Sequence, residues 1–250
     1  MIELISFLKL PDNAWVNQRV PKKLLLDQCT PTATDKRRLQ EGIEELVWVA
    51  ALKPSNIGVP AFQDENRNYL EIHILTVGLR SGAKAARIVE LIHRTIPYPV
   101  ALVAGQEDGV TFSLAHKRFS QAEVGQMVVE RVEMTAPFMS KSLSEPVTAF
   151  LSGLALAEQP KQNLFALYQG WIDHVAALAA AGITGTYRSA ESPERAAARH
   201  TALDEFAGLK KEIAALRAQA EREKQVNRLV ELNLKIKRLE AMLAATMKEL

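Results

Sequence analysis

Hydrophobic runs mark five strands in the first half of the chain. Residues 45–52 are β-branched and aromatic before the breakers Pro54 and Gly58. Residues 69–77 alternate, which predicts Leu70, Ile72 and Ile74 on one face and Glu71, His73 and Leu75 on the other. The remaining strands are predicted at residues 99–104, 110–116 and 127–134. The pair Asp108-Gly109 favours a hairpin turn between the third and fourth strands.

Apolar residues at helical spacing predict helices on either side of these strands. Ile88, Ile92 and Ile96 recur on one face of residues 83–96, and Pro97 ends that helix. Thr34 or Asp35 can cap a helix that continues to Glu45, because a short side-chain oxygen accepts the first backbone N–H groups. The order strand, strand, helix and three strands predicts an α+β fold, a small mixed β-sheet with flanking helices.

The composition changes after Pro137 to one rich in alanine and leucine. Helices are predicted at residues 147–156 and 163–181, and a polar linker follows. From Glu194 to the end there is no proline and a single glycine, Gly208, which is typical of a long helix or coiled coil. The predicted organisation is a body at 1–136, a helical segment at 137–184, a linker at 185–193 and a coiled-coil tail at 194–250.

Two apolar stripes run along this tail with alternating spacings of three and four residues. They are out of phase across residues 221–228, where a continuous coil would rewind or the helix would change partner. A helix with a one-sided stripe needs its apolar seam buried. We weigh an intramolecular hairpin against residues 147–181, self-association, and docking on another protein. The predicted seam consists of Leu209, Ile213, Leu216, Leu229, Leu232, Ile236, Leu239, Leu243 and Leu250.

Composition and charge narrow the class of protein. The net charge is +2, so any basic surface must be local. The single cysteine, Cys29, allows no internal disulfide, and the N-terminus does not read as a signal peptide. Together with the absence of a long apolar run, these features predict a soluble, cytoplasmic protein with no membrane contact.

Familiar catalytic motifs are missing from the sequence. There is no phosphate-binding glycine loop, no His-Glu-x-x-His and no nucleophile elbow, and the five histidines are scattered singly. We therefore predict no catalytic residues, no metal site and no cofactor. A weaker alternative is a metal-dependent nuclease using Asp64 and Glu71, with His73 where a lysine is expected and Lys53 or Lys84 as substitutes. Glu71 could instead pair with Lys22 or Lys23.

Several short pieces of the sequence together resemble the bacterial domain of unknown function 4391. The resemblance covers nearly the whole chain, and the sequence departs from the usual pattern at Ala50-Ala51. It implies an accessory protein that accompanies helicases and DNA methyltransferases in restriction-like or antiphage gene clusters. Any shared pocket would contain Lys22, Lys23, Trp48, Asn56 and Glu71. The matching pieces are Val20-Pro21-Lys22-Lys23, Val47-Trp48, Leu52-Lys53-Pro54-Ser55-Asn56-Ile57, Glu71-Ile72-His73-Ile74, Ile96-Pro97, Glu223-Lys224-Gln225-Val226-Asn227, Val230-Glu231-Leu232-Asn233 and Ile236.

The leading hypothesis is a non-catalytic assembly protein that associates with itself or with a helicase or methyltransferase through its coil. The alternative is a nucleic-acid-binding module. It would use the patch from Arg19 to Lys23 and the tail, which carries ten Lys/Arg against six Asp/Glu between Gly208 and Leu250. No aromatic residue is interleaved in the tail for base stacking, which weakens that alternative.

Overall fold

The computed structural model describes residues 2–28, 32–122, 126–139 and 143–250. These fall into two compact units, Met1–Val175 and Ala176–Leu250, whose boundary lies inside helix α7 (Leu164–Thr184). Cys29, the single cysteine, lies outside the described residues. Among the described helices, none has the length and apolar character needed to cross a bilayer.

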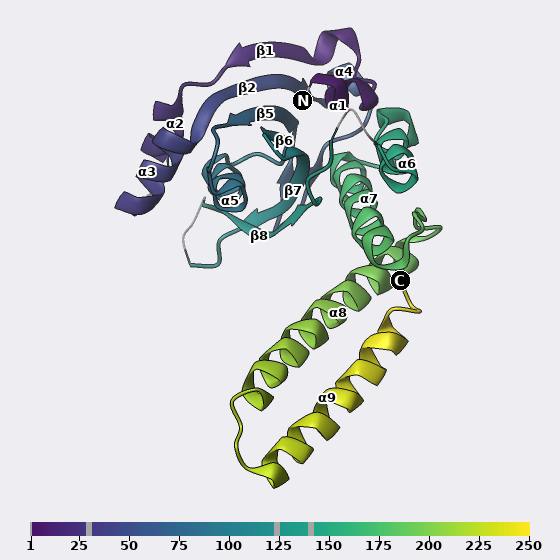
Figure 1. Cartoon of the computed structure of the whole chain (residues 1–250). Helices are drawn as coiled ribbons and strands as arrows, with labels where there is room; N and C mark the ends of the chain where they lie inside the picture. Colours follow the sequence, from purple (N-terminus) through teal and green to yellow (C-terminus); the bar gives the residue numbers. More distant parts are fainter. Residues whose placement is uncertain (1, 29–31, 123–125, 140–142) are drawn as a thin grey trace. The chain divides into compact units, whose positions relative to one another are not determined.

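The first unit is built on a six-stranded mixed sheet, which confirms the predicted α+β class (Figure 1). Its strand order is β1-β2-β5-β6-β7-β8. Strands β5 and β6 are parallel and are joined through helix α5, while the other neighbours are antiparallel. The six strands are β1 (Trp15–Arg19), β2 (Ile43–Leu52), β5 (Ile72–Leu79), β6 (Val100–Gln106), β7 (Gly109–Phe119) and β8 (Met127–Met134).

Short elements connect and cover these strands. A separate two-stranded sheet is formed by β3 and β4 between β2 and β5. The remaining elements of this unit, in chain order, are α1 (Ile2–Phe7), η1 (Asp12–Ala14), α2 (Lys22–Gln28), α3 (Ala33–Gly42), α4 (Pro54–Ile57), β3 (Phe62–Gln63), β4 (Asn68–Tyr69), α5 (Ala85–Thr95), α6 (Glu145–Gly153) and η2 (Leu156–Glu158).

One face of the sheet packs against α2, α3 and α5. Side chains such as Leu39, Leu75 and Ile92 are buried together there in one continuous apolar core. Residues 83–96 were predicted to be a helix from their apolar spacing, and α5 confirms it. Helix α3 ends at Gly42 rather than at Glu45, because the chain from Ile43 onward already pairs with β5.

The opposite face of the sheet is covered by α6 and the first part of α7. The Tyr168 hydroxyl donates to the Val100 carbonyl at 2.6 Å and accepts from the Ala115 amide at 2.8 Å, so α7 is bonded to two strands. The Trp171 indole N–H donates to the Leu154 carbonyl at 2.9 Å. Because both faces are covered, β5 is buried along most of its length on both sides, not on one.

The β6–β7 hairpin turns at residues 107–108, with Gln106 opposite Gly109, so Gly109 of the predicted Asp-Gly pair is already the first residue of β7. Gly109 has φ +129°, and a Cβ built there would lie 2.6 Å from the Phe138 carbonyl oxygen. Glycine is required at this position both by the backbone conformation and by that close approach.

The second unit contains α8 (Pro193–Ala220) and α9 (Val226–Thr246), which form an antiparallel helical hairpin (Figure 1). The chain reverses at residues 221–225, within the segment where the two apolar stripes lose phase. Each stripe is therefore the partner of the other. Leu209, Ile213 and Leu216 of α8 are buried with Ile236 and Leu239 of α9.

Candidate functional site

Trp48 and Glu71, two of the five residues expected in a shared pocket, both lie beside His73 of β5. His73 is sandwiched between two aromatic rings: its centroid is 4.7 Å from that of Trp48 and 4.6 Å from that of Tyr98, with interplanar angles of 22° and 18°. Glu71 lies beside the imidazole, with Oε1 3.2 Å from His73 Nε2. On its other side, Glu71 Oε2 is 3.2 Å from Lys53 Nζ. We call Trp48, Lys53, Glu71, His73 and Tyr98 the aromatic-acid cluster.

Asn56, the third expected residue, holds the loop that carries Lys53. Its side-chain oxygen accepts from the Lys53 amide at 2.8 Å, and its side-chain nitrogen donates to the Ala51 carbonyl at 2.8 Å. Pro54 opens the short helix α4, and Gly58 closes it with φ +68°. Asn56 thus fixes the direction in which the chain leaves β2 and positions Lys53 near Glu71.

Lys22 and Lys23 are separate from this cluster. Lys22 Nζ donates to the carbonyls of Gln40 and Ile43, where helix α3 gives way to β2. Arg80 donates to the Glu41 carbonyl at 3.1 Å at the same place. Two cations thus satisfy carbonyls left open at a helix C-terminus. The proposed pairing of Glu71 with Lys22 or Lys23 is wrong, because Lys53 and His73 occupy that carboxylate.

Burial and the neighbouring charges set the protonation of the aromatic-acid cluster. Burial lowers the pKa of His73, and the Glu71 carboxylate opposes that shift without cancelling it. Burial raises the pKa of Glu71, but contacts from His73 and Lys53 outweigh it and leave that pKa below its ordinary value. The cluster therefore holds an ionised Glu71 beside a neutral His73 at neutral pH.

Asp64, the second acid of the nuclease alternative, is used in a turn. Its Oδ1 accepts from the backbone amides of Asn66 at 2.8 Å and Arg67 at 2.6 Å, between β3 and β4. Within the described parts of the chain, no three His, Cys, Asp or Glu side chains converge in a way that could hold a metal ion. Asp64 thus stabilises a turn, while Glu71 lies between Lys53 and His73.

A second group of titratable side chains lies inside the core. His93 is fully buried with Nε2 3.0 Å from Ser113 Oγ, and burial lowers its pKa to about 3. Lys117 is 1% exposed, and its ammonium donates to the Ile96 carbonyl near the end of α5. Burial lowers the pKa of Lys117 to about 7. Lys117 lies one residue beyond the predicted strand at residues 110–116, and the sequence pattern gives no sign that its side chain points inward.

A chain of hydrogen bonds connects the sheet to α7. The Tyr69 hydroxyl lies 2.5 Å from His116 Nδ1, and His116 Nε2 lies 2.7 Å from the Gln169 side-chain oxygen. Because that amide oxygen only accepts, Nε2 carries the ring proton and Tyr69 donates to Nδ1. Gln169 then donates to Asp173 at 2.8 Å. These residues lie far apart in sequence, so spacing could not have identified the chain of bonds.

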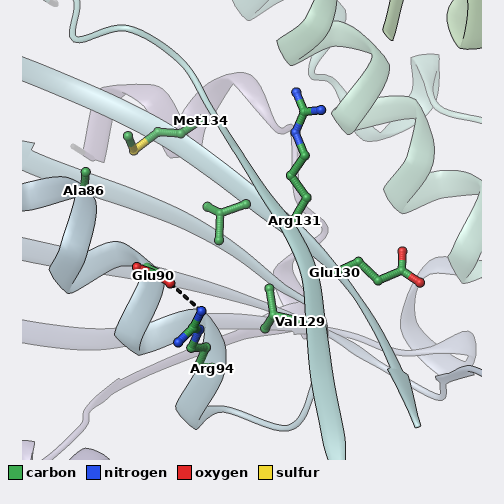
Figure 2. Close-up of a pocket in the computed structure, with 8 residues that line it drawn as sticks. Ala86, Glu90, Arg94, Val129, Glu130, Arg131 and Met134 are labelled. Carbon is green, nitrogen blue, oxygen red and sulfur yellow. Dashed lines mark ion pairs between the residues drawn. The ribbon is translucent and has the colours of Figure 1, made fainter. Parts of the chain in front are cut away.

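A hollow of about 290 Å³ lies between α5 and the edge strand β8 (Figure 2). Its lining includes Val129, Val132 and Met134 from the strand. Glu90 and Arg94 of α5 form an ion pair beside it at 2.6 Å. In Figure 2 the Glu130 and Arg131 side chains point away from the hollow. The charged residues that line the hollow are held in ion pairs, Glu90 with Arg94, Glu130 with Arg67 and Arg131 with Glu133.

The α8–α9 hairpin has a closed seam and an open outer face. Arg217 pairs with Glu240 at 2.6 Å and Glu212 with Lys235 at 2.9 Å, and these two ion pairs link the helices beside the buried seam. Of the predicted seam, Leu229, Leu232, Leu243 and Leu250 are only partly buried. On the other side of α9, the apolar residues Val226, Val230, Leu234 and Met242 are exposed to 71%, 51%, 54% and 49%.

The architecture defines a two-unit α+β protein, a mixed sheet covered by helices on both faces and followed by a helical hairpin. The chain belongs to the family described as a domain of unknown function (DUF4391), whose model matches residues 8–243. The family resemblance expected from the sequence is thereby confirmed. No curated protein and no solved structure matches the chain.

Proposed function

We propose that this protein is a non-catalytic assembly protein, and that the outer face of α9 is the surface through which it binds other protein. The observation behind this proposal is an apolar stripe on α9 that stays exposed although α8 and α9 pack against each other. The seam residues already shield one another, so Val226, Val230, Leu234 and Met242 contribute nothing to the interior. Four large apolar side chains along one exposed helix face are typical of an interaction site.

The polar clusters of the first unit support a structural rather than a chemical role. His73 is covered on both ring faces, and His93 has no exposed surface. Asp64 is engaged by two backbone amides. A general base must reach the proton that it removes, and these side chains have their reactive atoms turned toward their own neighbours.

We further propose that the assembly includes a helicase or a DNA methyltransferase, as the expectation for this family suggests. The α/β unit would provide the folded body, and the hairpin would provide the contact.

Affinity purification of the tagged full chain from cells that express its neighbouring genes tests the proposal. The comparison uses two charge insertions, Leu234→Glu on the outer face of α9 and Leu70→Glu on the first unit. The control is matched because the two leucines are 54% and 50% exposed. We expect a helicase or methyltransferase to be retained by wild type and by L70E, and lost from L234E. Equal retention by both variants would remove α9 as the contact surface.

A further inference from the structure

The outer face of α9 has a regular spacing that restricts what can bind to it. Val226, Val230 and Leu234 follow one another at intervals of four residues, and Met242 lies eight residues further along. Residues four apart form a shallow ridge on a helix, and such ridges pack against another helix. The place of the missing member is taken by Arg238, whose aliphatic stem can cover apolar surface while its charge stays in water.

The charged residues near this ridge would meet residues of opposite charge on a second α9 helix that runs in the opposite direction. Glu231 comes three residues before Leu234 and Arg238 comes four residues after it, and at 100° per residue both fall on the same side of Leu234. In an antiparallel pair of helices, residues on the same side and at equal distances before and after the centre face each other. An antiparallel copy of α9 centred on Leu234 would therefore bring Glu231 to Arg238 twice.

Neither of these charges is used inside the described part of the hairpin. The cross-hairpin ion pairs employ Glu212 with Lys235 and Arg217 with Glu240, which leaves Glu231 and Arg238 without an ion pair among the described residues. On the other side of the ridge Lys237 would lie beside Val230 of the copy, where its stem adds apolar contact. The outer face is thus complementary to itself in both shape and charge.

Resting on the proposed function, we propose that the protein bound at this face is a second copy of the same chain, and that a helicase or methyltransferase is retained through the dimer so formed. The two copies form a twofold-symmetric dimer in which the α9 helices cross antiparallel at Leu234. An interface of this kind uses the same patch on both subunits. With four exposed apolar residues from each copy, it belongs to the small and reversible class of interfaces, so the dimer should dissociate on dilution.

Sedimentation velocity of the full chain over a wide concentration range tests this proposal. Wild type should shift from monomer to dimer as concentration rises, and Leu234→Glu should remain monomeric because it places two carboxylates against each other at the centre. Glu231→Arg and Arg238→Glu should each weaken the dimer by roughly tenfold, since each creates two like-charge contacts. The double variant E231R/R238E should recover wild-type dimerisation, because it exchanges the charges and restores both contacts.

Circular dichroism checks that each variant keeps its helices, and Leu70→Glu serves as the matched exposed control. A chain that stays monomeric at all concentrations refutes the proposed dimer. A double variant E231R/R238E that fails to recover dimerisation refutes it as well. A monomeric chain that still captures a helicase or methyltransferase in an L234E-sensitive way leaves the assembly function standing and removes only the dimer. If the chain neither dimerises nor captures a helicase or methyltransferase, both proposals are wrong.

Discussion

Lys117 provides a direct test of how the core tolerates a buried charge. Its ammonium is 1% exposed and has a single described partner, the Ile96 carbonyl. Burial lowers the pKa of Lys117 from its ordinary 10.5 to about 7. A shift of this size corresponds to about 5 kcal/mol of difference between the charged and neutral forms, at about 1.4 kcal/mol per unit. The folded state therefore carries that cost wherever the lysine is protonated.

The direction of the pH dependence follows from the two pKa values. Between pH 7 and 10.5 the unfolded chain binds the proton and the folded chain releases it, so stability rises with pH across this window. Below pH 7 both states are protonated and the full penalty remains. Lys117→Met removes the charge but leaves the Ile96 carbonyl without a donor, which costs roughly 1–3 kcal/mol. The variant should thus be more stable than wild type by about 2–4 kcal/mol below pH 7.

Urea unfolding followed by tryptophan fluorescence measures this difference. The three tryptophans, Trp15, Trp48 and Trp171, all lie in the first unit, so the signal reports the unit that contains Lys117. The advantage of the variant should shrink as the pH rises above 7 and change sign before pH 10.5, because the wild-type penalty disappears while the unpaired carbonyl of the variant remains. Lys23→Met, at an exposed lysine, should change the free energy of unfolding little at any pH. A Lys117→Met protein that is equally destabilised at pH 6 and pH 10 would refute the reasoning.

Three further predictions follow from other contacts. The Arg87 guanidinium lowers the pKa of Asp35 to about 2, so Asp35→Asn should reduce stability at neutral pH. In urea unfolding, the difference from wild type should vanish as the pH falls from 3.8 toward 2. Proton NMR should show His73 titrating below its ordinary 6.5, and Glu71→Gln should lower that pKa further, because the carboxylate favours the imidazolium; an unchanged titration would contradict the contact. Ile236→Ala should destabilise the hairpin by about 2–5 kcal/mol, seen as an earlier loss of helical dichroism with the tryptophan transition unchanged.

The aromatic-acid cluster shows how far a candidate site could be predicted from sequence. Trp48 and Glu71 were singled out together, and the structure places both beside His73, which stacks on Trp48 and contacts Glu71. Tyr98 was missed because it follows α5 between two prolines, where no local pattern relates it to His73. Lys22 was grouped with them only by the family resemblance, and it caps α3 instead.

Strand β1 shows the corresponding limit for the fold. Residues Trp15–Arg19 are exposed along their whole length, so no alternation of apolar and polar positions marks them as a strand. Asn17 has φ +51°, which interrupts the regular extended backbone. The strand exists because the open edge of β2 offers backbone partners, and that edge is formed only when the sheet assembles.

The sequence by itself determined the elements whose signal is local. The apolar spacing of α5, the Asp-Gly turn and the two tail stripes are properties of neighbouring residues, because helix and strand periods repeat within a few positions. Only the tertiary structure decided which surfaces meet: the two stripes pair with each other, Glu71 pairs with Lys53, and Lys117 points into the core. Those contacts join residues distant in the chain, and the free energy that selects them comes from burial and charge in the folded state.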